Sequence, residues 1–196
     1  KYLFNEKKCG WDTTTEEQKH DINKLGDEYI YYLNRCKTER EVVDFVKEVL
    51  GKNGFMNIKE KVVLLPGDKV YYVNRDKAVY IAVIGEKPLE AGLNIVGAHI
   101  DSPRLDLKPN PLYEDSGFAY FKTHYYGGIK RYQWTTIPLA LHGVVVRKDG
   151  TSVTVNVGED ENDPVFCVTD LLPHLAKEQM DRKLGDGIRG EELNIL

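Results

Sequence analysis

The spacing of apolar residues changes near Lys61, from the period of helices to the period of strands. Before this point apolar side chains recur at helical intervals, and after it they form short runs that turn residues separate. Apolar residues at helical spacing fall on one face only if the segment is a helix, and alternating apolar residues do so only if it is a strand. The chain must combine the two, and helices followed by consecutive strands predict an α/β fold with a mixed sheet.

Two amphipathic helices are predicted at the start of the chain. Thr13 and Thr14 each stand three residues before a glutamate, which is the spacing of a capping box. A second helix is predicted to begin at a capping box of Thr38 and Glu41 and to end at Gly51. The first helix carries apolar residues at helical spacing, namely Ile22, Leu25, Tyr29, Leu33 and Cys36.

Most segments after Lys61 are predicted to be strands. Apolar runs lie at residues 62–65, 70–73 and 79–84, with turn sequences at residues 66–68 and 74–77 between them. After Pro111, runs rich in β-branched and aromatic residues lie at residues 118–125, 132–136, 139–147 and 152–157. Asp149 and Gly150 predict a hairpin turn between the last two runs. Thr169 is predicted to cap a helix that carries Leu171, Leu172, Leu175 and Met180.

The run at residues 95–98 is apolar without alternation, which predicts a strand buried on both faces. The run stops at His99, Asp101 follows, and Pro103 and Pro109 are expected to end regular structure. Open α/β sheets bind ligands at the carboxyl ends of such strands. His99 can bind a metal through one ring nitrogen while Asp101 takes the proton of the other. A hydrogen-bonded pair without a ligand is the alternative.

Charge and composition exclude several classes of partner. The formal net charge of -4 and the isoelectric point of 5.8 argue against a nucleic-acid or anionic-membrane partner. The apolar runs are far shorter than the roughly 20 residues of a membrane span, and the N-terminus has no signal-peptide core. The three cysteines, Cys9, Cys36 and Cys167, are widely spaced, which is typical of free thiols and predicts a cytoplasmic location.

Residues 97–103, Gly-Ala-His-Ile-Asp-Ser-Pro, resemble the metal-binding segment of the aspartyl aminopeptidase (aminopeptidase I) family of dizinc metallopeptidases. The likeness continues in order through residues 125–129, 137–139, 163–166 and 172–175, so that it covers nearly the whole chain. The resemblance implies a zinc-peptidase-type α/β/α catalytic domain, of which residues 1–104 are the N-terminal part. It implies an inserted β-rich dimerisation domain at residues 105–196, itself incomplete.

The same resemblance implies an aminopeptidase that removes the N-terminal residue of peptides with two zinc ions, in a homo-oligomer built from dimers. His99 would be a zinc ligand, and Asp101 would be the catalytic-site residue that orients it. His174 would be a further ligand, in its own subunit or in a neighbour, and the alternative is a helix-surface histidine packed in the dimer contact. The family's bridging aspartate, Glu-Glu pair, further acidic ligand and C-terminal histidine have no counterpart here, so the site is expected to be incomplete. Glu191 and Glu192 are interpreted as a solvated charge pair rather than the missing pair, because their neighbours differ from the family's.

Two other functions stay open at this point. One is a non-catalytic oligomerisation or regulatory fragment. The other is a mononuclear zinc hydrolase that uses His99, His174 and a carboxylate, and zinc stoichiometry separates it from a dizinc enzyme. His124 and His142 lie in strand-like runs and are predicted to be structural, whereas His20 is predicted to face solvent.

Overall fold

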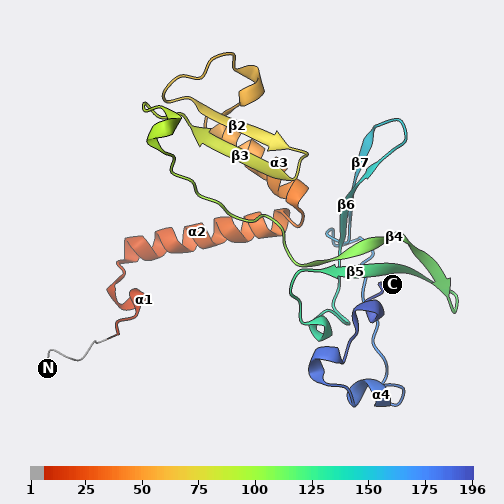
Figure 1. Ribbon diagram of the computed structural model, residues 1–196. Coiled ribbons are helices and arrows are strands. Elements are labelled where there is room, and N and C mark those ends of the chain that lie inside the picture. The colour runs from red at the N-terminus through yellow and green to blue at the C-terminus, as the bar shows by residue number, and fades with distance from the viewer. Residues whose placement is uncertain (1–6) are drawn as a thin grey trace. The chain divides into compact units, whose positions relative to one another are not determined.

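The computed structural model describes residues 7–196, and the chain divides into two compact units, residues 1–96 and 97–196 (Figure 1). Both units contain helices and strands, which confirms the predicted α/β class. Single turns of 3-10 helix lie at Ile58–Glu60, Leu89–Ala91, Arg131–Gln133, Leu184–Asp186 and Gly190–Glu192. None of the helices among residues 7–196 has the length and apolar composition that crossing a membrane requires.

The first unit opens with three helices: α1 (Gly10–Thr13), α2 (Glu16–Arg35) and α3 (Glu39–Lys52). The capping box of α2 joins Thr15 to Gln18, so the boxes predicted at Thr13 and Thr14 were wrong. The reason is local, because the hydroxyls of Thr13 and Thr14 both donate to the carbonyl of Gly10 in α1. Thr15 is the first threonine whose oxygen can accept from the amides of the new helix.

Helix α3 begins as predicted and ends later than predicted. The capping box of Thr38 and Glu41 is confirmed. The helix continues past Gly51, and Gly54 follows its end with a φ of +75°, a conformation that glycine adopts without strain. The Gly54 amide donates to the carbonyl of Gly51 at 3.2 Å, so Gly51 lies inside the last turn. The buried residues of α3 are Val42, Val43 and Leu50.

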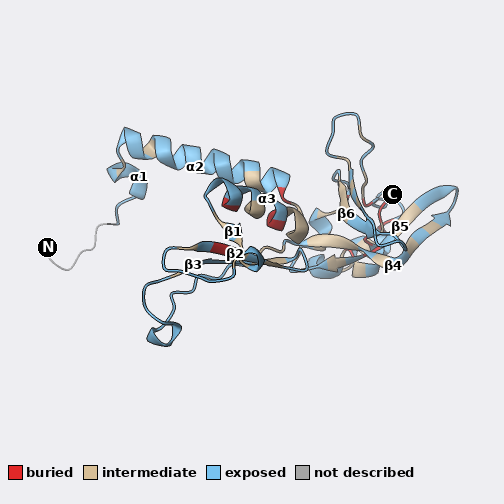
Figure 2. Ribbon diagram, turned by 90° about the horizontal axis from the view of Figure 1, so that it is seen from above, coloured by how far each residue is buried: buried red, intermediate tan, exposed pale blue. Residues whose placement is uncertain are grey.

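A three-stranded sheet completes the first unit, with β1 (Met56–Asn57) parallel to β2 (Lys69–Asn74) and β2 antiparallel to β3 (Ala78–Val83). This is the predicted mixed sheet. The predicted turn after β2 is also confirmed, and its central residues Arg75 and Asp76 have φ values of 54° and 55°. Helix α3 packs on the sheet (Figure 2). The buried residues of the unit lie on α3, at Val70 of β2 and at Cys36, which follows α2.

The strand predicted at residues 62–65 is wrong. This segment is a loop in which Val62 is 99% exposed. The carboxylate of Asp68 accepts a hydrogen bond from the Leu65 amide and one from the Lys61 ammonium, each at 2.8 Å. These two contacts hold residues 61–68 as a loop, in place of the backbone hydrogen bonds to a neighbouring strand that a strand would need.

The buried strand predicted at residues 95–98 is also wrong. The segment is extended but unpaired among residues 7–196, and Ile95 and Val96 are 82% and 98% exposed. An apolar run becomes a buried strand only when neighbouring strands take its backbone hydrogen bonds and helices cover its faces. No segment of the described chain supplies either.

Two hairpins build the second unit: β4 (Arg104–Asp115) with β5 (Phe118–Tyr126), and β6 (Leu141–Val146) with β7 (Ser152–Val157). The runs predicted at residues 118–125, 139–147 and 152–157 are confirmed, whereas residues 132–136 form no strand. Strand β4 continues through Pro109 and Pro111, contrary to the prediction. The pairing register shifts between Leu107 and Leu112, so this bulge accommodates the prolines.

The core of the second unit gathers residues from the end of the chain around β5. Val168, Ile188, Leu193 and Ile195 are buried there, with Phe121, Tyr125 and Trp134 packed against them. The helix predicted from Thr169 is wrong, since only α4 (Lys177–Met180) forms. The assignment of residues 1–104 to a catalytic domain and 105–196 to a dimerisation domain stays a prediction.

Candidate metal centre

His99 and Asp101 lie in the loop that precedes β4, in the second unit. The Nδ1 atom of His99 is 3.1 Å from the backbone oxygen of Asp101 and 3.3 Å from its Oδ1. Both oxygens are acceptors, so in the neutral ring Nδ1 carries the hydrogen and Nε2 keeps its lone pair. The His99 side chain is 85% exposed. This is the tautomer and the accessibility that a zinc ligand requires.

The Asp101 carboxylate has a second partner. The hydroxyl of Tyr126 donates to Oδ2 of Asp101 at 2.8 Å. This hydrogen bond, with smaller contributions from the backbone amide of Asp101 and from His99, lowers the pKa of Asp101 below its usual range. The carboxylate therefore stays ionised and accepts from both sides.

Neither Tyr126 nor its neighbour Arg104 was predicted to be a site residue. Tyr126 ends β5 and lies opposite Arg104 in the hairpin register. The Arg104 guanidinium lies over the Tyr126 ring, 4.2 Å from its centroid. After Tyr126, the chain turns at Gly127, whose φ is +80° and which lies close to Pro103. The only local signal was the turn sequence at residues 125–128.

The donor set fits one zinc ligand and its orienting carboxylate. His99 offers Nε2, and Asp101 holds the opposite side of the ring. A zinc centre needs three or four protein ligands. Within residues 7–196, no group of three or more histidine, cysteine, aspartate or glutamate side chains is arranged to hold a metal ion.

His174 lies in a turn at residues 173–175, before α4, and is exposed. Its predicted position on a helix is wrong, because the residues between Thr169 and Lys177 form no helix. The structure does not bring it into a ligand cluster with His99 within the described residues. Its role as a ligand stays a prediction.

The other acidic and histidine candidates have local partners. Glu191 pairs with Lys108 at 2.6 Å, which lowers the pKa of Glu191. Glu192 pairs with Arg182 at 2.9 Å. These ion pairs agree with the interpretation of the two glutamates as charges outside the metal site. His142 contacts Glu159 at 2.9 Å, with 9% of its side chain exposed, which agrees with a structural role.

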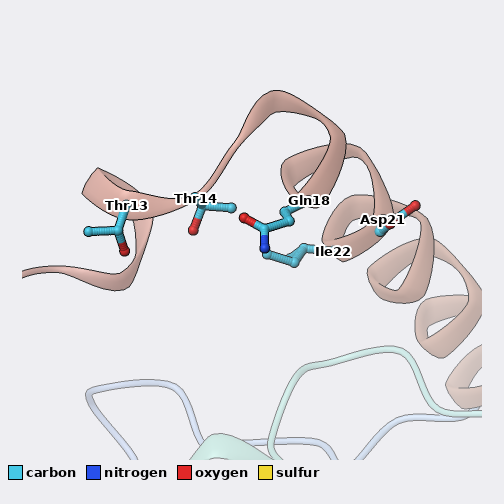
Figure 3. A pocket seen from close by; sticks show the side chains of 5 residues that line it. All are labelled: Thr13, Thr14, Gln18, Asp21 and Ile22. Carbon is cyan, nitrogen blue, oxygen red and sulfur yellow. The ribbon is translucent and has the colours of Figure 1, made fainter.

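A pocket at the start of α2 adds nothing to the metal centre. Figure 3 shows the five side chains that line it: Thr13, Thr14, Gln18, Asp21 and Ile22. This lining offers a single carboxylate and no imidazole or thiolate, so it lacks the donors that zinc prefers.

Comparison with known proteins identifies the family of the chain. A family model described as Aminopeptidase I zinc metalloprotease (M18) matches residues 32–195, which is most of the chain. The chain belongs to this family. The resemblance seen in residues 97–103 is thereby confirmed.

Curated relatives extend the match to nearly the whole chain. One from Clostridium acetobutylicum, named Probable M18 family aminopeptidase 1, is 52% identical over 198 residues, covering 99% of this chain and 43% of the relative. One of the same name from Borreliella burgdorferi strain B31 is 45% identical over 187 residues, covering 95% of this chain and 41% of the relative. The chain thus spans about two fifths of the length of these M18 relatives.

Solved structures of M18 aminopeptidases share this fold. The enzyme from Thermotoga maritima aligns with a TM-score of 0.88 at 44% identity, covering 98% of this chain and 41% of that chain. Aminopeptidase I from Clostridium acetobutylicum aligns with a TM-score of 0.86 at 48% identity, covering 99% and 43%. The S. cerevisiae mApe1 dodecamer, 22% identical with a TM-score of 0.66 over 90% and 38% of the two chains, shares the fold alone.

Proposed function

We propose that this M18 chain is the N-terminal part of a zinc aminopeptidase that hydrolyses the N-terminal residue of peptides. The observation that carries the proposal is the pairing of His99 with Asp101, which leaves Nε2 of an exposed imidazole for a metal. The family match over residues 32–195 supports zinc as that metal. Two zinc ions per complete site belong to the same proposal.

Zinc, when bound, would polarise the scissile carbonyl and lower the pKa of a bound water. His99 would hold the metal through Nε2. Asp101 would accept the Nδ1 hydrogen and keep the imidazole in the orientation and tautomer that a ligand needs. We assign the remaining ligands and the general base to parts of the protein outside this chain, since the chain spans 43% of its Clostridium acetobutylicum relative.

We further propose that His174 completes a metal site, in its own subunit or in a neighbouring one. Its exposure in the turn before α4 supports this role, because a buried side chain could not reach a second subunit. Residues 1–104 would then belong to the catalytic domain and residues 105–196 to a β-rich dimerisation domain. A homo-oligomer built from dimers is part of the proposal, and the dodecameric neighbour of 22% identity supports it. A cytoplasmic location is supported by the three free cysteines.

Zinc stoichiometry and peptide hydrolysis test the proposal together. In the natural polypeptide we expect two zinc ions per chain, and release of N-terminal residues that stops on chelation and returns when zinc is restored. Peptides with acidic and with neutral N-terminal residues would define the preference. One zinc per chain with hydrolysis would favour the mononuclear alternative. A protein that binds no zinc and releases no residue would be the oligomerisation or regulatory fragment.

A further inference from the structure

The loop that carries His99 is supported from one direction only within the second unit. On its C-terminal side, β4 begins at Arg104 and pairs with β5. The unit itself begins at Gly97, and residues 97–103 belong to no strand or helix. The geometry of His99 in this unit therefore depends on what holds the loop at the start of β4.

The end of β5 supplies contacts that hold that end of the loop. Arg104 and Tyr126 are paired in the register, and the guanidinium lies 4.2 Å from the ring centroid. Gly127, the next residue, lies close to Pro103, since a side-chain carbon placed on Gly127 would lie 3.5 Å from Pro103. The Tyr126 hydroxyl donates to Asp101 at 2.8 Å. This hydrogen bond reaches Asp101, the residue that holds His99.

We propose that Tyr126 is a positioning residue of the metal site, whose hydroxyl fixes the Asp101 carboxylate so that Asp101 directs Nε2 of His99 toward the metal. This inference rests on the proposed function. Each oxygen of the Asp101 carboxylate has its own partner: Oδ2 accepts a hydrogen bond from Tyr126, and Oδ1 lies 3.3 Å from Nδ1 of His99. A carboxylate held at one oxygen has a fixed plane, and the other oxygen then has a fixed position.

Asp101 needs such an anchor because its side chain is 38% exposed. A carboxylate in contact with water rotates and exchanges its partners unless a second hydrogen bond holds it. The Tyr126 ring is in turn held by Arg104, so the phenol oxygen is presented from a fixed ring. The chain of contacts therefore runs from Arg104 through Tyr126 and Asp101 to His99.

Tyr126→Phe tests the hydroxyl while it keeps the ring and its contact with Arg104. In the natural polypeptide, we expect the zinc affinity, measured by competition with a chromophoric chelator, to fall about tenfold, as for other residues that orient a ligand. The thermal unfolding of the metal-free protein serves as the check on folding. Tyr120→Phe is the matched control, since Tyr120 lies on the same strand and its ring stacks on Tyr113 instead. We expect it to leave the zinc affinity unchanged.

A double-mutant cycle with Asp101→Asn separates positioning from general packing. If Tyr126 acts through Asp101, Tyr126→Phe should add nothing to the loss of zinc affinity that Asp101→Asn causes. Additive losses would overturn the inference, and so would a Tyr126→Phe affinity within about twofold of the wild type. Tyr126→Phe could also lower the unfolding temperature through a loss of packing. The cycle still distinguishes the two roles, because a packing effect on zinc affinity would add to the effect of Asp101→Asn.

Failure of the proposed function has a different outcome. A wild-type protein that binds no zinc would overturn both proposals. A wild-type protein that binds zinc and cleaves peptides, together with a Tyr126→Phe variant of equal zinc affinity, would overturn the role of Tyr126 alone.

Discussion

The hydroxyl of Thr123 donates a hydrogen bond to the backbone carbonyl of Leu193, 70 residues further along the chain. Both residues are buried, with 1% and 0% of their surface exposed. Thr123 lies on β5, the strand that ends at Tyr126. This bond joins the strand that carries Tyr126 to the segment around Leu193, which is part of the core of the second unit.

Thr123→Val should lower the free energy of unfolding of the second unit by about 1–3 kcal/mol, because it keeps the shape of the side chain and leaves the Leu193 carbonyl buried without its donor. The fluorescence of Trp134, which packs against this core, would report unfolding in denaturant. Thr154→Val is the matched control, since Thr154 is exposed on β7. We expect the control to change stability by less than about 0.5 kcal/mol. Equal effects of the two substitutions would contradict the prediction.

His99→Ala should abolish or strongly weaken zinc binding without destabilising the metal-free protein. The His99 side chain is 85% exposed, so its removal costs less than about 0.5 kcal/mol of folding free energy. Metal analysis after dialysis and thermal unfolding with chelator present would measure the two effects. His20→Ala is the control, because His20 is exposed on α2. Retention of the full zinc content by His99→Ala would remove His99 from the site.

Thr38→Ala should destabilise the first unit by about 1 kcal/mol, since it removes the side chain that caps α3. Thr15→Ala removes the equivalent cap of α2, but α2 has no buried residue. We expect the second substitution to fray α2 locally and to leave the hydrogen-exchange protection of α3 unchanged. Hydrogen exchange of the α3 amides would compare the two. Equal losses of α3 protection would argue against this reasoning.

Asp68 should make the loop at residues 61–68 sensitive to acid. The Leu65 amide, and then the Lys61 ammonium, lower the pKa of Asp68 below 3.8. The folded form therefore binds its proton at lower pH than the unfolded form. The stabilisation is fully present above the unfolded value and is lost as the pH falls through the folded value. Acid titration would follow the difference in unfolding free energy between the wild type and Asp68→Asn. We expect this difference to shrink as the pH falls from the unfolded-state pKa of Asp68 to its folded-state pKa. A difference independent of pH would exclude the effect.

The features that follow from neighbouring residues were predictable from the sequence. The cap of α3 needs only Thr38 and Glu41, and the hairpin turn before β7 needs only Asp149 and Gly150. The cap of α2 was placed too early because a preceding helix engages two of three consecutive threonines. A pattern of residue types does not say which hydroxyl is free.

The features that depend on partners distant in the sequence were not predictable. The run at residues 95–98 has the composition of a buried strand, yet no described segment pairs with it. The pairing of His99 with Asp101 was predictable because the two residues are only two positions apart in the sequence. Tyr126 was missed because its contact with Asp101 spans 25 residues and depends on the register of β4 and β5.

The bulge in β4 also protects the hairpin from other chains. Between the pairs Leu107–Thr123 and Leu112–Phe121, residues 108–111 stand opposite Lys122 alone. Such a bulge bends and twists the strand, so the unpaired edge of the strand is no longer a straight row of hydrogen-bonding groups. A straight, unpaired strand edge is a template to which a second chain can add a strand, and such pairing leads to aggregation. The surplus residues around Pro109 and Pro111 interrupt that template, so the strand that starts beside the His99 loop resists recruitment into an intermolecular sheet.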